Sequence, residues 1–195
     1  MIEPIFATPI YKSDSLYQFS TEELDCLNSL KLSNNANNSS SVDLNILKKT
    51  ELEKLYNWCQ VNVDTFLTEL GKDEKAEIYI TKSWLNKNKT NKFHHPHHHP
   101  NSIVSAILYV DGEPTVPTLF HNSNNFSNFM FYNKGNMFNS NLFQVTNENG
   151  RLILFPSYLS HSVGVNTSNK TRVSISFNTF IKGTFGYSNY QLNIN

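Results

Sequence analysis

Apolar residues recur with helical spacing between residues 50 and 70. They follow one another at intervals of three or four positions, which places them on one face of a helix, and such a face is usually buried. Thr50 and Glu53 have the spacing of a capping box, so they predict the first turn of this helix. Gly71 predicts its end, because glycine readily adopts the left-handed conformation that terminates many helices.

A shorter helix is predicted over residues 21–31, where Ser20 and Glu23 also have capping-box spacing. The following segment, residues 31–41, is rich in asparagine and serine and has almost no large apolar side chain. Such a polar stretch has little with which to anchor itself in a core. We therefore expect a mobile loop there.

Beyond Gly71 the pattern changes from helical spacing towards alternation of apolar and polar residues, which indicates half-buried β-strands. Turn-forming residues separate the strands, and Asn149-Gly150 within residues 147–150 predicts a hairpin turn. A short extended segment is expected over residues 6–12. The other strands are expected at 77–86, 102–110, 115–120, 142–146, 151–155 and 172–181.

Helices followed by many short strands predict a mainly β protein with N-terminal helices. The number and spacing of the strands favour an antiparallel jelly roll, buttressed on one face by the long helix. We expect residues 1–195 to form a single domain. Its parts would be a helical N-terminal region over 1–75, a jelly-roll core over 76–185 and a tail over 186–195.

The net charge, the length of the apolar runs, the first fifteen residues and the cysteine count exclude several classes of protein. Sixteen basic and sixteen acidic side chains give no net charge, so the basic excess of a general nucleic-acid binder is missing. No apolar run approaches the ~18 residues of a membrane span. The first fifteen residues lack a signal-peptide pattern, and two cysteines make no disulfide framework. We expect a soluble protein of the reducing cytoplasm that does not bind membranes.

Five of the seven histidines lie within residues 93–102, directly before a predicted strand. Neutral imidazole binds borderline divalent metals, and in an extended chain the side chains of His97 and His99 point to the same side. His95 and His97 offer the same geometry two residues earlier. A solvated histidine-rich loop that binds metal loosely is an equally simple interpretation of this segment.

His161 lies late in the predicted barrel, within a strand–turn–strand segment. A lone histidine in such a place is more often an ordinary core or surface residue. A jelly roll, however, brings strands that are distant in sequence side by side at its open end. Two early histidines and one late histidine would make a facial three-ligand set with open positions, as in non-haem iron centres, which usually include a carboxylate ligand.

Arg172 is one of only two arginines and opens the last long strand. Ser174 follows two residues later and therefore lies on the same face of that strand. A guanidinium pointing into the barrel matches a carboxylate bidentately, and the hydroxyl could add a hydrogen bond to the same anion. The plain alternative is an exposed arginine that forms a salt bridge at the rim.

The motifs that contain these side chains resemble those of the 2-oxoglutarate- and iron(II)-dependent oxygenase family found in marine bacteria and cyanophages. That family is similar to prolyl hydroxylases, whose fold is a double-stranded β-helix. The similarity covers nearly the whole chain. In chain order, the motifs that carry it are Trp84-Leu85-Asn86, His97-x-His99-Pro100-Asn101-Ser102, Ser105-x-x-x-Tyr109, Phe155-Pro156-Ser157-x-x-x-His161-x-Val163 and Arg172-x-Ser174-x-Ser176-Phe177-Asn178.

The resemblance implies roles for these residues and a set of cofactors. His97 and His161 would bind iron(II), and Arg172 with the help of Ser174 would hold the far carboxylate of 2-oxoglutarate. Tyr109 and Asn86 would line the co-substrate pocket. The implied reaction is hydroxylation of an unidentified substrate with O2, and the cytoplasm would be that of the host cell if the gene belongs to a phage.

The second ligand departs from the pattern of the broad superfamily. Where that superfamily has His-x-Asp or His-x-Glu, this chain has His99. The implied centre is therefore a three-histidine iron site, or a site with two ligands and one more open position, and a shift of register to His95 and His97 is an alternative.

Two other functions fit the same sequence. The first is a three-histidine dioxygenase or isomerase of the cupin type that needs no keto acid, and for which Arg172 would be superfluous. The second is a non-enzymatic jelly roll that binds metal or carbohydrate. The sequence leaves the substrate open, and it leaves a homodimer open as well.

Overall fold

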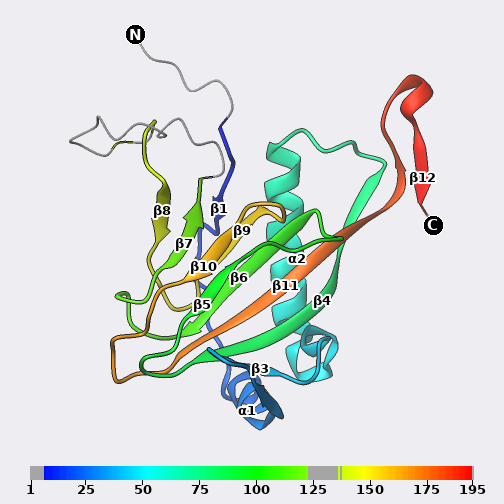
Figure 1. Ribbon diagram of the computed structural model, residues 1–195. Coiled ribbons are helices and arrows are strands. Elements are labelled where there is room, and N and C mark those ends of the chain that lie inside the picture. The colour runs from blue at the N-terminus through cyan, green and yellow to red at the C-terminus, as the bar shows by residue number, and fades with distance from the viewer. Residues whose placement is uncertain (1–6, 123–135, 137, 195) are drawn as a thin grey trace.

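The computed structural model describes residues 7–122, 136 and 138–194 (Figure 1). Twelve strands and two α-helices follow one another in these residues, with three 3-10 turns. The helices are α1 (Thr21–Ser29) and α2 (Glu53–Glu69), and the 3-10 turns are η1 (Ile46–Lys48), η2 (Thr50–Leu52) and η3 (Ser188–Tyr190). The strands are β1 (Tyr11–Lys12), β2 (Leu32–Asn34), β3 (Ser39–Ser41), β4 (Ala76–Asn88), β5 (His94–His97), β6 (Val104–Asp111), β7 (Thr118–His121), β8 (Leu142–Val145), β9 (Leu152–Pro156), β10 (His161–Val163), β11 (Arg172–Phe185) and β12 (Leu192–Ile194).

The strands form two antiparallel sheets that face each other. The major sheet has eight strands in the order β1-β9-β6-β11-β4-β3-β2, with β12 paired to β11. The minor sheet has the order β5-β10-β7-β8. This confirms the predicted mainly β jelly roll, because chain neighbours such as β5 and β6 lie in different sheets.

Alternation along the strands of the major sheet creates two cores. In β6, Leu108 belongs to the cluster beneath α2, together with Leu55 and Val63 of that helix. The next residue, Tyr109, belongs to the smaller cluster between the two sheets. The helix α2 thus covers one face of the major sheet, as the sequence predicts, and the minor sheet covers the other (Figure 1).

The capping box predicted for the first helix is confirmed, whereas the prediction of one for the second helix is wrong. The side chain of Ser20 accepts from the backbone N–H of Glu23, and the Glu23 side chain accepts from the N–H of Ser20. At the second helix, Thr50 opens a 3-10 turn and α2 begins only at Glu53, with no side-chain cap. Gly71, with φ +80°, terminates α2 as expected.

The expected mobile loop of residues 31–41 is instead the hairpin β2–β3, which extends the major sheet beside β4. This segment needs no apolar anchor, because its polar groups pair with one another and with β4. The Ser41 hydroxyl accepts the backbone N–H of Leu85 at 3.0 Å, and Asn35 donates to the side chain of Asn38 at 3.2 Å.

Residues 147–150 form a turn but not the predicted hairpin. The strand before the turn, β8, belongs to the minor sheet, and the strand after it, β9, belongs to the major sheet. Gly150 has φ +85°, and its carbonyl accepts the N–H of Tyr17 at 2.8 Å. A Cβ at this position would lie 2.5 Å from the Tyr17 carbonyl oxygen, so the crossing between sheets requires glycine.

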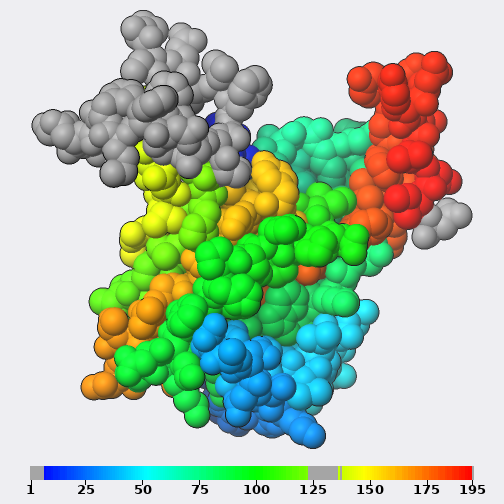
Figure 2. Space-filling model, viewed as in Figure 1, coloured from blue at the N-terminus to red at the C-terminus, as the bar shows by residue number. Residues whose placement is uncertain are grey.

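The long strands β4 and β11 continue past the two-sheet core, and β12 pairs with β11 to form an arm at the C-terminal end (Figure 2). Tyr187 and Tyr190 at the tip of this arm are exposed. None of the helices in the described part of the chain has the length and apolar character needed to cross a membrane.

Candidate metal centre and co-substrate pocket

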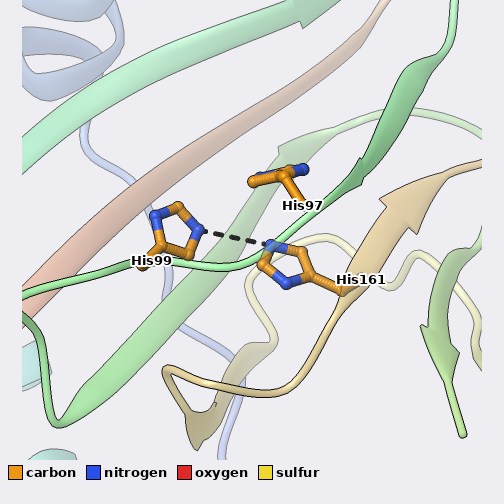
Figure 3. Close-up of side chains that lie close together, drawn as sticks. All are labelled: His97, His99 and His161. Carbon is orange, nitrogen blue, oxygen red and sulfur yellow. Dashed lines mark hydrogen bonds between the residues drawn. The ribbon is translucent and has the colours of Figure 1, made fainter. Parts of the chain in front are cut away.

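Three histidines from different segments converge between the sheets (Figure 3). His97 ends β5 and His161 begins β10, and the two are direct partners in the antiparallel pairing of these strands. His99 follows β5, and its Nε2 lies 3.3 Å from Nε2 of His161. One ring nitrogen from each residue can be chosen so that all three lie within 4.8 Å of one another.

In two of these rings, a hydrogen bond to a backbone carbonyl determines which nitrogen carries the proton. Nδ1 of His97 donates to the carbonyl oxygen of His95 at 2.9 Å, and Nδ1 of His161 donates to that of Leu159 at 3.1 Å. A neutral imidazole has one proton, so the lone pair of each ring lies on Nε2, and in His161 it accepts a hydrogen bond from Nε2 of His99. This is how proteins usually prepare histidines for metal coordination.

Burial keeps the histidines neutral. Burial is the main cause that lowers the pKa of His161 to about 3 and that of His99 to about 4, and the neighbouring His97 adds to both shifts. Neutral rings at physiological pH offer their lone pairs. Two nitrogens bound at right angles to one ion at about 2.1 Å would lie about 3.0 Å apart, close to the observed 3.3 Å.

The other histidines of the cluster take no part in this convergence. The side chains of His95 and His98 are exposed, and neither belongs to the group of three whose ring nitrogens lie within 4.8 Å of one another. His94 is half-buried, and its ring centre lies 4.2 Å from that of His97. It lines the pocket that lies next to the three histidines.

Arg172 lines this pocket and is only 1% exposed. Its Nη1 donates to the hydroxyl of Ser174 at 3.0 Å, and its Nη2 donates to the hydroxyl of Thr118 at 3.3 Å. The guanidinium carbon lies 5.2 Å from the centre of the Tyr109 ring, a cation–π arrangement. The plain alternative of an exposed arginine at the rim is therefore wrong.

No carboxylate neutralises Arg172 among the residues that the structure describes. The ion pairs there involve other residues, and Nε of Arg172 is buried without a hydrogen-bond partner. Burial lowers the pKa of the guanidinium, but arginine stays charged in proteins. A buried charge without a counter-ion is costly, so the pocket suits an anionic ligand.

The remaining expected pocket residues fall into two groups. Ser174 and Asn86 are cross-strand partners on β11 and β4, and both line the pocket. The Asn86 side chain donates to the hydroxyl of Ser176 at 3.1 Å. Tyr109 lies beneath Arg172 rather than on the pocket wall, and its hydroxyl is hydrogen-bonded to that of Thr118 at 2.8 Å.

Sequence reasoning missed Asn88, the cross-strand partner of Arg172. Asn88 is 1% exposed and lines the pocket, and its Nδ2 has no hydrogen-bond partner among the residues that the structure describes. Two unpaired donors, Asn88 Nδ2 and Arg172 Nε, therefore lie at the same end of the pocket. The two-residue spacing from Asn86 put Asn88 on the same face of the strand and was the signal available in the sequence.

Residues 82–178 match the model of a protein family described as "Putative 2OG-Fe(II) oxygenase". This segment runs from β4 into β11 and contains the three histidines, Asn88 and Arg172. A search among curated proteins found no sequence relative.

Solved structures share the fold at low sequence identity. A 2OG-Fe(II) oxygenase family oxidoreductase from Burkholderia pseudomallei is 13% identical, with a TM-score of 0.62, over 87% of this chain and 83% of that chain. HygX from Streptomyces hygroscopicus, solved with nickel, 2-oxoglutarate and hygromycin B, is 11% identical, with a TM-score of 0.56 over 88% and 82%. A Trichoplax adhaerens prolyl hydroxylase, solved with a hypoxia-inducible-factor peptide fragment, is 14% identical, with a TM-score of 0.57 over 88% and 83%.

Proposed function

We propose that the protein is an iron(II)- and 2-oxoglutarate-dependent hydroxylase in which His97, His99 and His161 hold the iron, since residues 82–178 match the 2OG-Fe(II) oxygenase model and contain all three histidines. The convergence of the three imidazoles supports this assignment. The hydrogen bonds from Nδ1 of His97 and His161 to backbone carbonyls also support it, because they leave the lone pair of each ring on Nε2. Three ligands on one side of an ion leave positions open for a chelating keto acid and for O2.

The centre we propose has three neutral ligands. The usual facial set of two histidines and one carboxylate lowers the charge of an iron(II) site to +1, whereas three imidazoles leave it at +2. A site with more positive charge attracts a carboxylate more strongly. The substitution at His99 is therefore compatible with binding an anionic keto acid, although it removes a charged ligand from the metal.

We propose that Arg172 binds the far carboxylate of 2-oxoglutarate. The buried, unneutralised guanidinium is the observation that carries this proposal. Ser174 and Thr118 orient the fork by accepting from Nη1 and Nη2, and Tyr109 supports it from below. When bound, iron(II) and 2-oxoglutarate supply the oxidising chemistry, in which O2 gives one oxygen atom to the substrate and the other to succinate as CO2 leaves.

The same arginine argues against the two alternative functions. A cupin-type site that uses no keto acid has no need of a buried cation in the wall of its pocket. A metal-holding jelly roll without activity would have no use for it either. Keeping a buried charge without a counter-ion is costly, so the pocket favours a ligand that brings a carboxylate to Arg172.

Adding 2-oxoglutarate to the anaerobic iron(II) protein should produce a visible charge-transfer band. We expect the band because chelation by the keto acid places its carbonyl in direct contact with the metal. Succinate has two carboxylates but no keto group and is the matched control, which should give no band. A colourless protein with bound iron and saturating 2-oxoglutarate would contradict the proposal and favour the cupin-type function.

The Asn88→Asp variant should bind 2-oxoglutarate at least about tenfold more weakly, or ~1.4 kcal/mol. The new carboxylate would keep the shape of the side chain, but it would pair with Arg172 and repel the far carboxylate of the co-substrate. Titration of the charge-transfer band measures this affinity. Asn62→Asp, at a buried asparagine of α2, is the control. Equal affinities in the two variants would remove Asn88 from the binding site.

Several finer features belong to the same proposal. The motifs favour the branch of the family that occurs in marine bacteria and cyanophages. The enzyme would work in the cytoplasm, and if a phage encodes it, this would be the cytoplasm of the host cell. Residues 1–195 would form one domain with its jelly-roll core over 76–185. The enzyme would act on its substrate without general binding of nucleic acid, and a homodimer is compatible with this scheme.

A further inference from the structure

His99 lacks the structural support that fixes the other two histidines. His97 and His161 are paired in a sheet, and both donate from Nδ1 to a backbone carbonyl. His99 lies in the connection between β5 and β6, and within the described residues its Nδ1 forms no hydrogen bond. Its ring contacts that of Trp84, with the ring centres 5.6 Å apart. The position of His99 therefore depends on whatever holds this connection.

Ser157 holds the connection at its beginning and at its end. Its carbonyl accepts the backbone N–H of His99 at 2.9 Å, and its own N–H donates to the carbonyl of Ile103 at 3.0 Å. Its hydroxyl donates to that of Ser102 at 2.8 Å and is also hydrogen-bonded to the hydroxyl of Ser105 at 2.8 Å. In the described part of the chain, the four hydrogen bonds of Ser157 all end within residues 99–105.

The network around Ser157 is shielded from water. Ser157 and Ser105 are each 1% exposed, so their hydrogen bonds do not compete with solvent. Ser102 continues the network by donating to the Val104 carbonyl at 3.1 Å and accepting the backbone N–H of Thr179 at 3.2 Å. The connection is thereby joined to β6 and β11, which are neighbouring strands of the major sheet.

Ser157 also lies only four residues before His161, in the turn between β9 and β10. It therefore joins the segment that leads into one histidine to the segment that carries another. We propose that Ser157 is a positioning residue that sets the distance between His99 and His161 and so completes the metal site. This inference rests on the proposed function, because it takes these histidines as ligands.

The identity of the ligand explains the need for such support. A carboxylate in this position would be drawn to a cation by its charge, even from a loosely held segment. A neutral imidazole has no such attraction, so its position must be set before the metal arrives. Residues that orient ligands in this way typically change metal affinity by 10- to 100-fold when they are removed.

The Ser157→Ala variant should therefore bind iron(II) at least about tenfold more weakly than the wild type. It keeps both backbone hydrogen bonds and loses only those of the hydroxyl. Anaerobic titration of iron(II) alone, without co-substrate, measures the affinity. Ser13→Ala is the matched control, because Ser13 is also 1% exposed and its hydroxyl also makes two hydrogen bonds, to Ser15 and Leu152. This control should lose stability but keep the iron affinity.

A double-mutant comparison separates positioning from a general effect on the fold. In a His99→Ala background, Ser157→Ala should cause no further loss of iron affinity, since the residue on which it acts is gone. Equal losses in both backgrounds, or an affinity like that of Ser13→Ala, would overturn the inference. If Ser157→Ala does not fold, Ser102→Ala removes the partner of the same hydroxyl and should show the same dependence on His99. A wild type that binds no iron would overturn the proposed function itself.

Discussion

Replacing His161 by alanine should abolish stoichiometric iron binding while leaving the fold intact. His161 has two of the closest contacts of the site, a direct pairing with His97 and the 3.3 Å approach to His99. Losing one of three ligands should cost about 3–5 kcal/mol of metal affinity, roughly a 100- to 4000-fold weakening. Metal analysis after dialysis measures the iron that remains bound.

The fold should survive this change because the backbone of His161 pairs with β5 and β7 whatever the side chain is. The lost ring leaves a small gap beside Phe155, so we expect a modest fall in melting temperature. His97→Ala should behave in the same way. The exposed His95 provides the matched control, and His95→Ala should keep its iron. Full iron occupancy in His161→Ala would remove this residue from the site.

The sequence predicts the fold well where burial decides the structure. Alternation located β4, β6, β7, β9 and β11, and helical spacing located α2, because each of these elements buries one face in a core. The histidine-rich strand β5 shows no apolar alternation, and the sequence did not predict it. The failures are segments that are held by polar pairing. The hairpin β2–β3 has little apolar content and is attached through the edge of β4, which no local pattern records. The turn at 147–150 has hairpin residues, but the strands beside it pair elsewhere.

The site was predictable to the extent that chemistry follows from residue type and spacing. His97, His99 and His161 could be grouped because a jelly roll brings early and late strands together, and the direct pairing of β5 with β10 does so here. The unpaired donor of Asn88 and the place of Tyr109 beneath Arg172 could not be predicted. Whether a buried polar atom has a partner depends on every segment packed around it, and spacing along one strand does not contain that information.

Changing Arg172 to alanine should weaken 2-oxoglutarate binding by about 2–5 kcal/mol, or on the order of 30- to 4000-fold. A charged bidentate hydrogen bond in a buried pocket is stronger than one at the surface, since water neither competes for the donors nor screens the charges. Arg172→Lys keeps the charge but loses the fork and the hydrogen bonds to Ser174 and Thr118. We therefore expect an intermediate affinity for that variant.

Neither change at Arg172 should alter the iron affinity, because the three histidines lie on other strands and loops. The melting temperature should change little for Arg172→Ala, since the desolvation cost relieved by removing a buried charge without a counter-ion in the described residues offsets the gap and the lost hydrogen bonds to Ser174 and Thr118. Titration of 2-oxoglutarate into the anaerobic iron(II) protein compares the wild type with both variants. Arg151→Ala is the control, because Arg151 pairs with Glu148 and does not line the pocket. Equal affinities in all four proteins would show that the guanidinium does not bind the co-substrate, and the buried charge would then need another anion.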